Sequence, residues 1–593
     1  MPPVAAIALA LALSSGGYVA DSACATCHAD IARSYQHTGM ARAFFRPSQS
    51  KIIEELGKEF VHAPSKQIFE MVWRDGRLIF RRWQRDPDGK PINLLEQPVD
   101  WILGSGHHSR IYVYRTPEGE LYQLPIAWYS QSRSWGMAPG YDRADHDGVT
   151  RRVRHECMFC HNGYPEMTES RDGFWRAQTF PKELPEGTGC QRCHGPGAAH
   201  ARDPKAAIVN PIRLTPQRRN DVCNQCHLLP AVAVQGARKL GRDIYSFRPG
   251  EALSDYQLTT DIAPNDRFEI SQHAYRLQKS RCFRESKGQL GCLECHDPHR
   301  RPPPEERAAH YQRVCLGCHE KAHHATSECV SCHMQKRRTE DVVHVAMTDH
   351  RIGLPADSGK LLAPLEENDP PVENVVLYEQ LPVAGLPVAS ADARQPITGN
   401  RQPETDLYRL LPLMRAGRDR DPRIFAAFEQ ALAAAKPVEL EPLYDLANAQ
   451  ANQQQWTALE ATCRRILERE PSNQLAFGWL GIAAAGQHRD EEAIAFFRRA
   501  PERAGLHVQI ALALHRLGKD DDAIAELERA TSLRPNLAVA WLTLGEIHAQ
   551  RGNAARAISA LRRALAIEPS DARASALLSR ALIAVGDRAR TPK

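Results

Sequence analysis

The chain has 593 residues, a formal net charge of +5, 42% hydrophobic residues and 25% charged residues. This length is too great for one hydrophobic core, so we expect two or more domains. The charge is too small to favour a nucleic acid as partner. All but one of the 16 cysteines lie before residue 333, which divides the chain into a cysteine-rich part of about 350 residues and a remainder.

The first 20 residues, MPPVAAIALALALSSGGYVA, contain an apolar stretch followed by small residues. This pattern is typical of a secretory signal peptide and is too short to span a bilayer, although no basic residue precedes the apolar stretch. We therefore expect residues 1–20 to be removed and the protein to be periplasmic or extracellular. No other stretch is apolar enough for a membrane helix, so we expect no transmembrane segment in the mature chain.

Residues from about 51 to 141 alternate between apolar and polar side chains. The stretch FEMVWRDGRLIFRRW alternates around Asp75 and Gly76, which favour a tight turn, and SRIYVYRTPEGELYQLPIAWY repeats the pattern around Glu118 and Gly119. Two β-hairpins are predicted here. We interpret this region as a small β-rich insert.

Seven times the sequence contains two cysteines separated by two residues and followed directly by histidine. In chain order these motifs 1 to 7 are Cys24/Cys27/His28, Cys157/Cys160/His161, Cys190/Cys193/His194, Cys223/Cys226/His227, Cys292/Cys295/His296, Cys315/Cys318/His319 and Cys329/Cys332/His333. The two thiols of such a motif form thioethers with the vinyl groups of one porphyrin, and the histidine then ligates its iron. A zinc ribbon is the alternative, but its cysteine pairs need no following histidine. We therefore expect seven covalently attached haem c groups in residues 21–353, packed closely enough to form much of the core.

Residues 354–405 contain recurring prolines and no regular period, which predicts a linker. Beyond it a 34-residue period appears, because Pro501, Pro535 and Pro569 are 34 residues apart. Tetratricopeptide repeats have this period. We predict a repeat array over residues 406–593, with clear repeats at about 440–571 and a capping helix at 572–586. Such an array offers a concave surface to a protein or peptide partner; the alternative is that it only stabilises the cytochrome or makes it dimerise.

The second axial ligand of each iron decides whether a haem passes electrons or binds a substrate. Eighteen histidines lie outside the motifs, which is more than enough to provide a second histidine ligand for each of seven irons. Four have a context that favours this role, although each could also be an ordinary histidine: His200, His299, His344 and His350. Met40 and Met347 are further candidates with an alternative core role. Cys463 fits a helix-packing position in the repeats, where it would be a small buried apolar residue. Cys282 is either another small buried apolar residue or a lone thiol near haem.

Several segments together resemble the multihaem c-type cytochromes related to hydroxylamine-oxidising and nitrite-reducing enzymes, and more closely the bacterial subset that ends in tetratricopeptide repeats. They are GSGHHSRIY, WGMAPGYDR, ECMFCHNGYP, CQRCHGPGAAH, CFRESKGQLGCLECHDPH and CHMQKRRTEDVVHVAMTDH. The resemblance implies an exported electron-transfer protein with mostly bis-histidine haems. It implies as distal ligands His37, His62, His108, His200, His299, His344 and His350, with His146, His155, His273, His310, His323 and His324 in reserve. The chain lacks the Cys-x-x-Cys-Lys motif of the nitrite reductases, which argues against nitrite reduction by their route.

The predicted fold is therefore mainly α, a haem-packed cytochrome domain with a β-rich insert followed by a helical solenoid. Three functions remain open. The leading one is electron transfer along seven haems between redox partner proteins, with the repeats docking a partner. The alternatives are an oxidoreductase acting on a small nitrogen or sulfur oxyanion at an open haem, and a subunit of a conducting filament or other oligomer. An open haem would be high-spin, whereas a pure carrier would be low-spin throughout.

Overall fold

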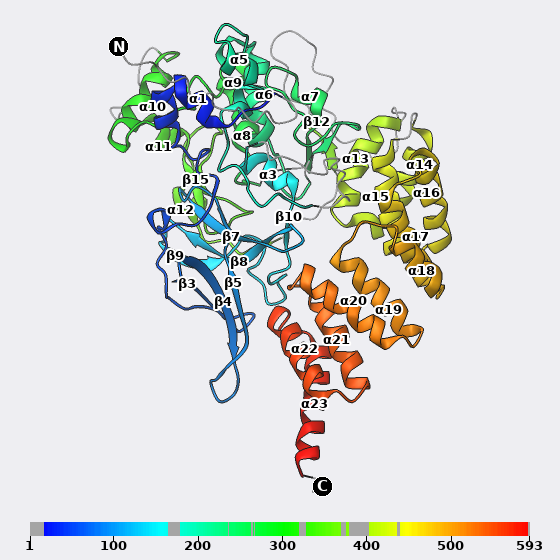
Figure 1. Cartoon of the computed structure of the whole chain (residues 1–593). Coiled ribbons are helices and arrows are strands. Elements are labelled where there is room, and N and C mark those ends of the chain that lie inside the picture. The colour runs from blue at the N-terminus through cyan, green and yellow to red at the C-terminus, as the bar shows by residue number, and fades with distance from the viewer. Residues whose placement is uncertain are drawn as a thin grey trace, which may run out of the picture.

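In the computed structural model the described residues are 17–163, 178–234, 236–262, 265, 267–319, 328–368, 375–378, 403–435 and 439–590. Most of the expected signal peptide lies outside them, as do His323 and His324. The described chain contains a motif-bearing region of short helices, two antiparallel sheets beside it and a long array of paired helices (Figure 1).

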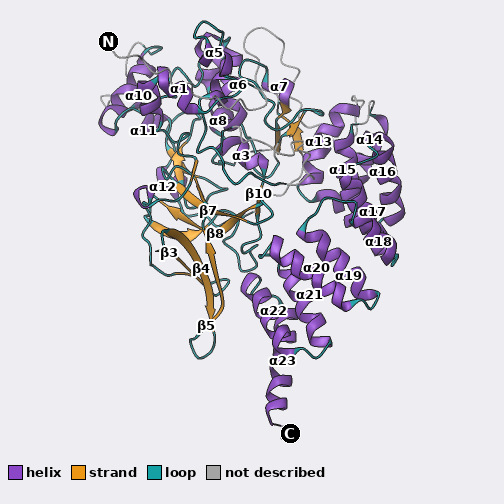
Figure 2. Cartoon of the chain, viewed as in Figure 1, coloured by secondary structure: helices purple, strands orange, loops and turns teal. Residues whose placement is uncertain are grey.

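The β-rich region consists of two sheets of six and four strands. The larger has the path β1-β6-β7-β8-β10 with β9 on β8, and the smaller has the order β2-β3-β4-β5. Their bounds are β1 Phe44–Phe45, β2 Phe60–His62, β3 Gln67–Arg74, β4 Arg77–Arg85, β5 Pro91–Pro98, β6 Trp101–Leu103, β7 Ser109–Arg115, β8 Leu121–Tyr129, β9 Ser134–Met137 and β10 Arg152–Val153. Figure 2 shows these strands gathered on one side of the molecule.

Both predicted hairpins are confirmed. Strands β3 and β4 pair up to Arg74 and Arg77, so the loop is the two residues Asp75 and Gly76, and both have positive φ angles of 52° and 73°. Positive φ at both positions is the signature of the type I′ turn that the Asp-Gly pair favours. The strands extend from Phe44 to Val153, beyond the expected 51–141, because β1 pairs with β6 and β10 with β8.

The motif-bearing region is built from short helices and two-stranded ribbons. Its helices are α1 Asp21–Cys27, α2 Ala29–Tyr35, α3 His155–His161, α4 Gln191–His194, α5 Ala198–Arg202, α6 Pro216–His227, α7 Leu253–Tyr256, α8 His273–Gln278, α9 Arg281–Glu285, α10 Arg307–Leu316 and α11 Cys329–His333. Its ribbons are β11 Ala237–Arg238 with β12 Gln257–Leu258 and β14 Lys336–Arg338 with β15 Ala346–Thr348. Four of these helices, α1, α2, α10 and α11, contain no buried residue.

The C-terminal array confirms the predicted repeats. Four helix pairs follow one another: α15 Leu440–Asn452 with α16 Trp456–Arg469, α17 Gln474–Gly486 with α18 Asp490–Phe497, α19 Ala504–Arg516 with α20 Asp520–Leu533, and α21 Ala538–Gln550 with α22 Ala554–Ile567. The capping helix α23 spans Ala572–Arg590. A further pair that the sequence pattern did not reveal, α13 Pro403–Arg415 and α14 Pro422–Ala434, precedes them.

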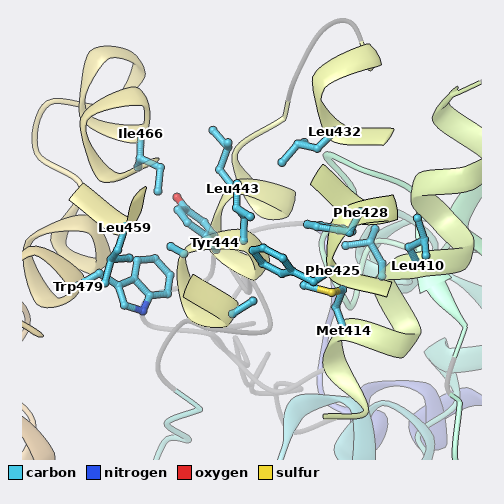
Figure 3. Packing of buried hydrophobic residues seen from close by; sticks show 14 of the residues in the cluster. Leu410, Met414, Phe425, Phe428, Leu432, Leu443, Tyr444, Leu459, Ile466 and Trp479 are labelled. Atoms are coloured by element: carbon cyan, nitrogen blue, oxygen red, sulfur yellow. The ribbon is translucent and has the colours of Figure 1, made fainter. Parts of the chain in front are cut away.

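Close helix approach in the array depends on small residues. A Cβ on Gly545 would lie 2.7 Å from Leu561 Cγ, and one on Gly481 would lie 2.4 Å from the ring of Phe497. Cys463 is fully buried in the core, as its position in the repeat predicts. Figure 3 shows the part of this core where α13 and α14 meet the first repeats, with Phe428 and Leu443 among its members.

Buried hydrogen bonds and ion pairs connect the repeat array to the β-rich region. The buried guanidinium of Arg82 on β4 donates to the carbonyl oxygens of Ala566 and Ile567 at the end of α22. At the turn between β7 and β8, the buried Glu118 carboxylate lies 3.6 Å from Arg503 and 3.4 Å from Arg534. These contacts hold several repeats against the sheets.

The expected linker 354–405 is described only in part. It contains α12 Ser358–Leu362 and β16 Val375–Leu377, and β16 pairs with β13 Thr260–Ile262. The Glu367 carboxylate accepts hydrogen bonds from the backbone N–H groups of Gly140 and Asp142 at 2.8 and 2.9 Å. Its described residues therefore lie against the N-terminal region. Among the described helices, none has the length and apolarity needed to cross a membrane.

Candidate cofactor site

The first four motifs touch one another through hydrogen bonds of their own residues. Asp21, in the helix of motif 1, accepts from the N–H of Cys190 of motif 3 at 3.1 Å. Inside motif 3, Arg192 donates to the carbonyl of Phe159 of motif 2 at 2.6 Å. Gln225 of motif 4 donates to the carbonyl of Arg192 at 3.2 Å. Motif 3 therefore contacts motifs 1, 2 and 4.

Contacts of the same kind connect motif 4 to motifs 5, 6 and 7. Arg219 on the helix of motif 4 forms an ion pair of 2.7 Å with Glu294 inside motif 5. His310, on the helix that leads into motif 6, donates to the carbonyl of Cys295 of motif 5 at 3.2 Å. Helix α10, which carries Cys315, then packs on α11, which carries motif 7. All seven motifs thus form one contiguous set.

Several motifs, including motif 6, differ from the expectation that the motifs are buried in a haem-packed core. The exposed motif residues include Cys27, His28, Cys157, Cys318, His319 and Cys332. Cys318 and His319 follow directly after helix α10, which ends at Leu316. The backbone N–H of His319 still donates to the carbonyl of Cys315 at 3.0 Å, so the motif keeps its local turn. Thioether formation and iron ligation by Cys318 and His319, as by the other motif residues, stay predictions.

Four motif histidines each face another histidine. The ring centroids of His28 and His200 are 6.4 Å apart, with 9° between the planes. For His194 and His299 these values are 6.0 Å and 11°. The other two pairs are His296 with His350, at 6.2 Å, and His227 with His273, at 5.1 Å.

Three of these separations fit a metal ion between the rings. Two metal–imidazole bonds of about 2 Å each, with roughly another ångström from each nitrogen to its ring centre, place the centroids about 6 Å apart. Stacked rings in contact would lie closer together, at the lower end of the usual 4.5–7 Å range. The pairs formed by His28, His194 and His296 therefore have room for an iron, whereas the pair of His227 and His273 is tighter.

Hydrogen bonds fix the tautomer of several of these rings. A backbone carbonyl only accepts, so the nitrogen beside it carries the proton and the other nitrogen keeps its lone pair for a metal. His194 donates from Nδ1 to the carbonyl of Val209 at 2.8 Å, and His200 donates likewise to Ala206 at 3.0 Å. His333 of motif 7 donates to Gly353 at 2.9 Å. In each of them Nε2 therefore keeps a lone pair, as a metal ligand requires.

Burial favours the neutral form of two histidines that lie beside motif histidines, His273 and His350. Burial, followed by repulsion from His227 and His350, lowers the pKa of His273 well below its usual value. Burial, followed by repulsion from His296, lowers the pKa of His350 to about 4. A neutral imidazole is the form that ligates iron.

The structure brings three of the seven expected distal ligands, His200, His299 and His350, beside motif histidines. His62 instead has both ring nitrogens engaged, Nδ1 with Ser65 at 2.8 Å and Nε2 with Asp142 at 3.1 Å. This conformation leaves His62 no lone pair for iron.

The remaining expected ligands lie elsewhere. His344 lies 3.7 Å from the carboxylate of Asp142 and its ring packs against Tyr129. His37 is exposed after α2, and Nδ1 of His108 is buried without a hydrogen-bond partner. For these three residues and for His62, ligation stays a prediction.

One residue beside the motif histidines, His273, was expected only as a reserve ligand. Its pairing with His227 depends on the packing of α8 on α6, and no local pattern signals such a contact. Conversely, within the described part of the chain no histidine outside the motifs lies beside the ring of His161. Motif 2 thus differs from motifs 1, 3, 4 and 5, in which the motif histidine lies beside a second histidine.

Comparison with protein families supports both the haem-binding motifs and the helical repeats. A doubled CXXCH motif matches residues 286–324, which contain motifs 5 and 6, and this indicates haem binding. Two tetratricopeptide-repeat families match residues 444–506 and 514–581. The C-terminal helices are therefore a tetratricopeptide-repeat solenoid, a fold that binds proteins or peptides. A search of curated proteins gives no match to the chain.

Among solved structures, several repeat proteins are similar to part of this chain. TTC0263, a thermophilic TPR protein of Thermus thermophilus, is 24% identical with a TM-score of 0.26, covering 30% of this chain and 99% of its own. YrrB, described as a TPR protein with an unusual peptide-binding site, is 22% identical with a TM-score of 0.24, covering 27% and 85%. A MamA protein is 20% identical with a TM-score of 0.23, covering 25% and 83%.

Proposed function

We propose that this chain, a tetratricopeptide-repeat solenoid joined to a region of haem-binding motifs, is an exported cytochrome that carries electrons among seven covalently bound haems. When bound, each haem supplies a one-electron carrier whose iron cycles between two oxidation states. The chain's own residues would hold each group by two thioethers and a histidine. The solenoid would dock a protein partner that gives or takes the electrons.

The contiguity of the motifs carries this proposal. Each motif contacts at least one other, from Asp21 beside Cys190 to α10 packed on α11. Haems attached at these positions would lie close together, as electron hopping requires. Paired histidines such as His28 with His200 support it further, because a six-coordinate haem passes electrons without binding a substrate.

The extracytoplasmic location and the relation to hydroxylamine-oxidising and nitrite-reducing cytochromes are parts of the same proposal. Attachment of haem to this kind of motif takes place outside the cytoplasm, which agrees with the apolar N-terminal stretch.

Haem content and spin state test the proposal. The protein, purified from a host that attaches haem c, should contain seven haems by pyridine haemochrome assay and by mass. Its spectrum should be predominantly low-spin. A colourless product that binds zinc instead would overturn the proposal.

A second function is favoured by one observation: among the described residues no histidine outside the motifs lies beside His161, a feature that His333 of motif 7 shares. A five-coordinate haem at motif 2 would bind a small ligand, and the protein would then be an oxidoreductase for a nitrogen or sulfur oxyanion. A high-spin signal for one haem in seven, abolished by nitrite, hydroxylamine or sulfite, would favour this function. A fully low-spin spectrum would remove it.

A further inference from the structure

Motif 4 lies at the end of α6, and each of its two thiols contacts a thiol of another motif. The thiol of Cys160 in motif 2 donates a hydrogen bond to the sulfur of Cys226. The thiol of Cys223 donates likewise to the sulfur of Cys292 in motif 5. All four cysteines are partly buried, and both contacts join segments that are far apart in the sequence. Motif 4 is therefore connected through its sulfur atoms to two other motifs.

Packing of protein side chains fixes the first of these contacts. Helix α3, which carries Cys160, packs on α6, which carries Cys226. Phe159 of α3 is buried in a hydrophobic cluster with Phe247 and Tyr256, and both cysteines pack against this cluster. The two cysteines also line the same cavity of about 380 Å³. The polypeptide alone thus holds the two thiols together, and the cavity leaves room for a small reagent to reach them.

A close approach of the backbone fixes the second contact. A Cβ on Gly291 would collide with Oδ1 of Asn220, so glycine is what allows the chain to pass this close to α6. The backbone N–H of the next residue, Cys292, donates to the same oxygen at 3.4 Å. Asn220 and Cys223 are three residues apart on α6 and therefore share one face of the helix. This approach places Cys292 beside Cys223.

These contacts favour bonds between motifs over bonds within a motif. Cys223 and Cys226 lie nearly one turn apart on α6, and they contact different partners. Thiols that are already in contact need little movement to reach the sulfur–sulfur bonding distance of about 2 Å. Disulfide exchange also requires that a reagent has access to one sulfur of the pair, as the cavity provides at Cys160 and Cys226.

We propose that the haem-free chain is open to thiol oxidation at motif 4, where it forms one disulfide between Cys160 and Cys226 and a second between Cys223 and Cys292. In each pair one thiolate attacks glutathione disulfide, or another disulfide reagent, and releases one thiol from it. The second thiolate of the pair then attacks the mixed disulfide and releases the other thiol. The pair loses two electrons and two protons, and the reagent gains them as two thiols.

Oxidation around this one helix would withhold three motifs from haem. Thioether formation needs free thiols, and the two disulfides occupy both thiols of motif 4 and one thiol each of motifs 2 and 5. A dithiol reductant must then act before haem can attach at these three motifs. This consequence rests on the proposed function, whereas formation of the disulfides does not.

Disulfide mapping of the full-length haem-free chain tests the inference. Chain from a host that cannot attach haem c is reduced, freed of reductant, exposed to glutathione disulfide, alkylated, digested and analysed by mass spectrometry. We expect peptides that link Cys160 to Cys226 and Cys223 to Cys292 to exceed those with links inside a motif. In guanidinium chloride, which unpacks α3 from α6, links inside a motif should predominate because a shorter loop costs less entropy to close.

Single substitutions separate the two bonds. Cys226→Ser should abolish the link to Cys160 and keep the link between Cys223 and Cys292, and Cys223→Ser should have the opposite effect. Cys157→Ser, in the same motif as Cys160, is the matched control and should leave both links. Links mainly inside motifs in the native wild-type chain, or the same pattern with and without denaturant, would overturn the inference.

A haem-attaching host tests the consequence for maturation. When thiol-reducing capacity outside the cytoplasm is removed from this host, haem should be lost from motifs 2, 4 and 5 before motifs 1, 3, 6 and 7, as peptide masses would show. Equal loss at all seven motifs would contradict a block between motifs. Wild-type protein without haem from the complete host would instead overturn the proposed function, without changing the disulfide map of the haem-free chain.

Discussion

The imidazole rings of His28 and His200 lie nearly parallel, with 9° between their planes and 6.4 Å between their centroids. His28 is fixed by motif 1, and His200 is fixed by a hydrogen bond from its Nδ1 to the carbonyl of Ala206. Two chain segments far apart in sequence thus bring two nearly parallel imidazole rings to a separation that leaves room for a metal ion. This pair is therefore open to direct test.

Replacing His200 should change the spin state of one haem. In the proposed holoprotein His200→Ala would remove the second ligand of the haem at motif 1, so we expect one haem in seven to become high-spin and to bind cyanide. Electron paramagnetic resonance and cyanide titration measure this change. His488→Asn, at an exposed position of the array where φ is 58°, is the control and should leave the spectrum unchanged. A wholly low-spin spectrum for His200→Ala would show that another ligand serves motif 1.

Replacing Gly545 with alanine should destabilise the array, whereas replacing Gly505 with alanine should stabilise it. A Cβ at Gly545 would meet Leu561 at 2.7 Å, and overpacking of this kind costs about 1–3 kcal/mol. A Cβ at Gly505, near the start of α19, meets nothing within 4 Å, and Gly→Ala in a helix gains about 0.4–1 kcal/mol. Urea unfolding followed by circular dichroism should therefore show opposite shifts of the midpoint. Equal shifts would contradict the close approach of α21 and α22.

Much of this architecture could be predicted because local patterns determine it. The Asp75–Gly76 hairpin and the repeats follow from turn chemistry and from the 34-residue period. Helices α13 and α14 were missed because they fall before the period becomes regular. The cysteine motifs were found in the same way, since two thiols and a histidine at fixed spacing are a local signal.

The second ligands could be predicted only in part, because they depend on tertiary packing. His200 and His299 had a local cue in their glycine and proline neighbours, and both lie beside motif histidines. His62 was implied by resemblance alone, and the fold directs both its ring nitrogens to Ser65 and Asp142. His273 had no local cue, because its position beside His227 arises only when α8 packs on α6.

Arg82 should be required for docking of the array. It is fully buried, burial lowers its pKa to about 10, and it donates to the carbonyls of Ala566 and Ile567. Arg82→Met keeps most of the volume but leaves these acceptors without a donor, at a cost of about 1–3 kcal/mol. Arg85→Met, at an exposed position paired with Glu59, is the matched control and should cost little. Amide exchange at the end of α22 should accelerate only in Arg82→Met.

Asp341 should make stability depend on pH. Burial, followed by repulsion from Glu269, raises the pKa of Asp341 from 3.8 to about 7. Between these values the folded protein keeps a proton that the unfolded chain has lost, so the contribution of this group to stability falls as pH rises and is lost above about pH 7.

Asp341→Asn isolates this contribution, because an amide oxygen can still accept from the N–H of Ile270, which lies 3.0 Å from the carboxylate. We expect the variant to be more stable than wild type at about pH 8 and similar to it at about pH 4. Urea midpoints across this range give the difference. A variant that is less stable than wild type at high pH would show that the ionised carboxylate is favoured in the folded protein.

Without haem, the regions around motifs 1, 6 and 7 should not fold. Helices α1, α2, α10 and α11 contain no buried residue, so side-chain packing within the protein does not hold them. Helices as short as these are unstable in water unless an apolar surface covers one face, and in the proposed holoprotein a porphyrin would supply that surface at these motifs. The solenoid is different, since residues such as Leu459, Ala511 and Leu561 are completely buried.

Chain produced in a host that cannot attach haem c should therefore show two classes of amide exchange by mass spectrometry. Residues 21–35, 307–316 and 329–333 should exchange at rates close to those of unfolded peptide, whereas the helices from 440 to 567 should remain protected. In the holoprotein both classes should be protected. Protection of α10 and α11 in the apoprotein would mean that polypeptide alone forms their core, and it would remove the structural argument for haem at motifs 6 and 7.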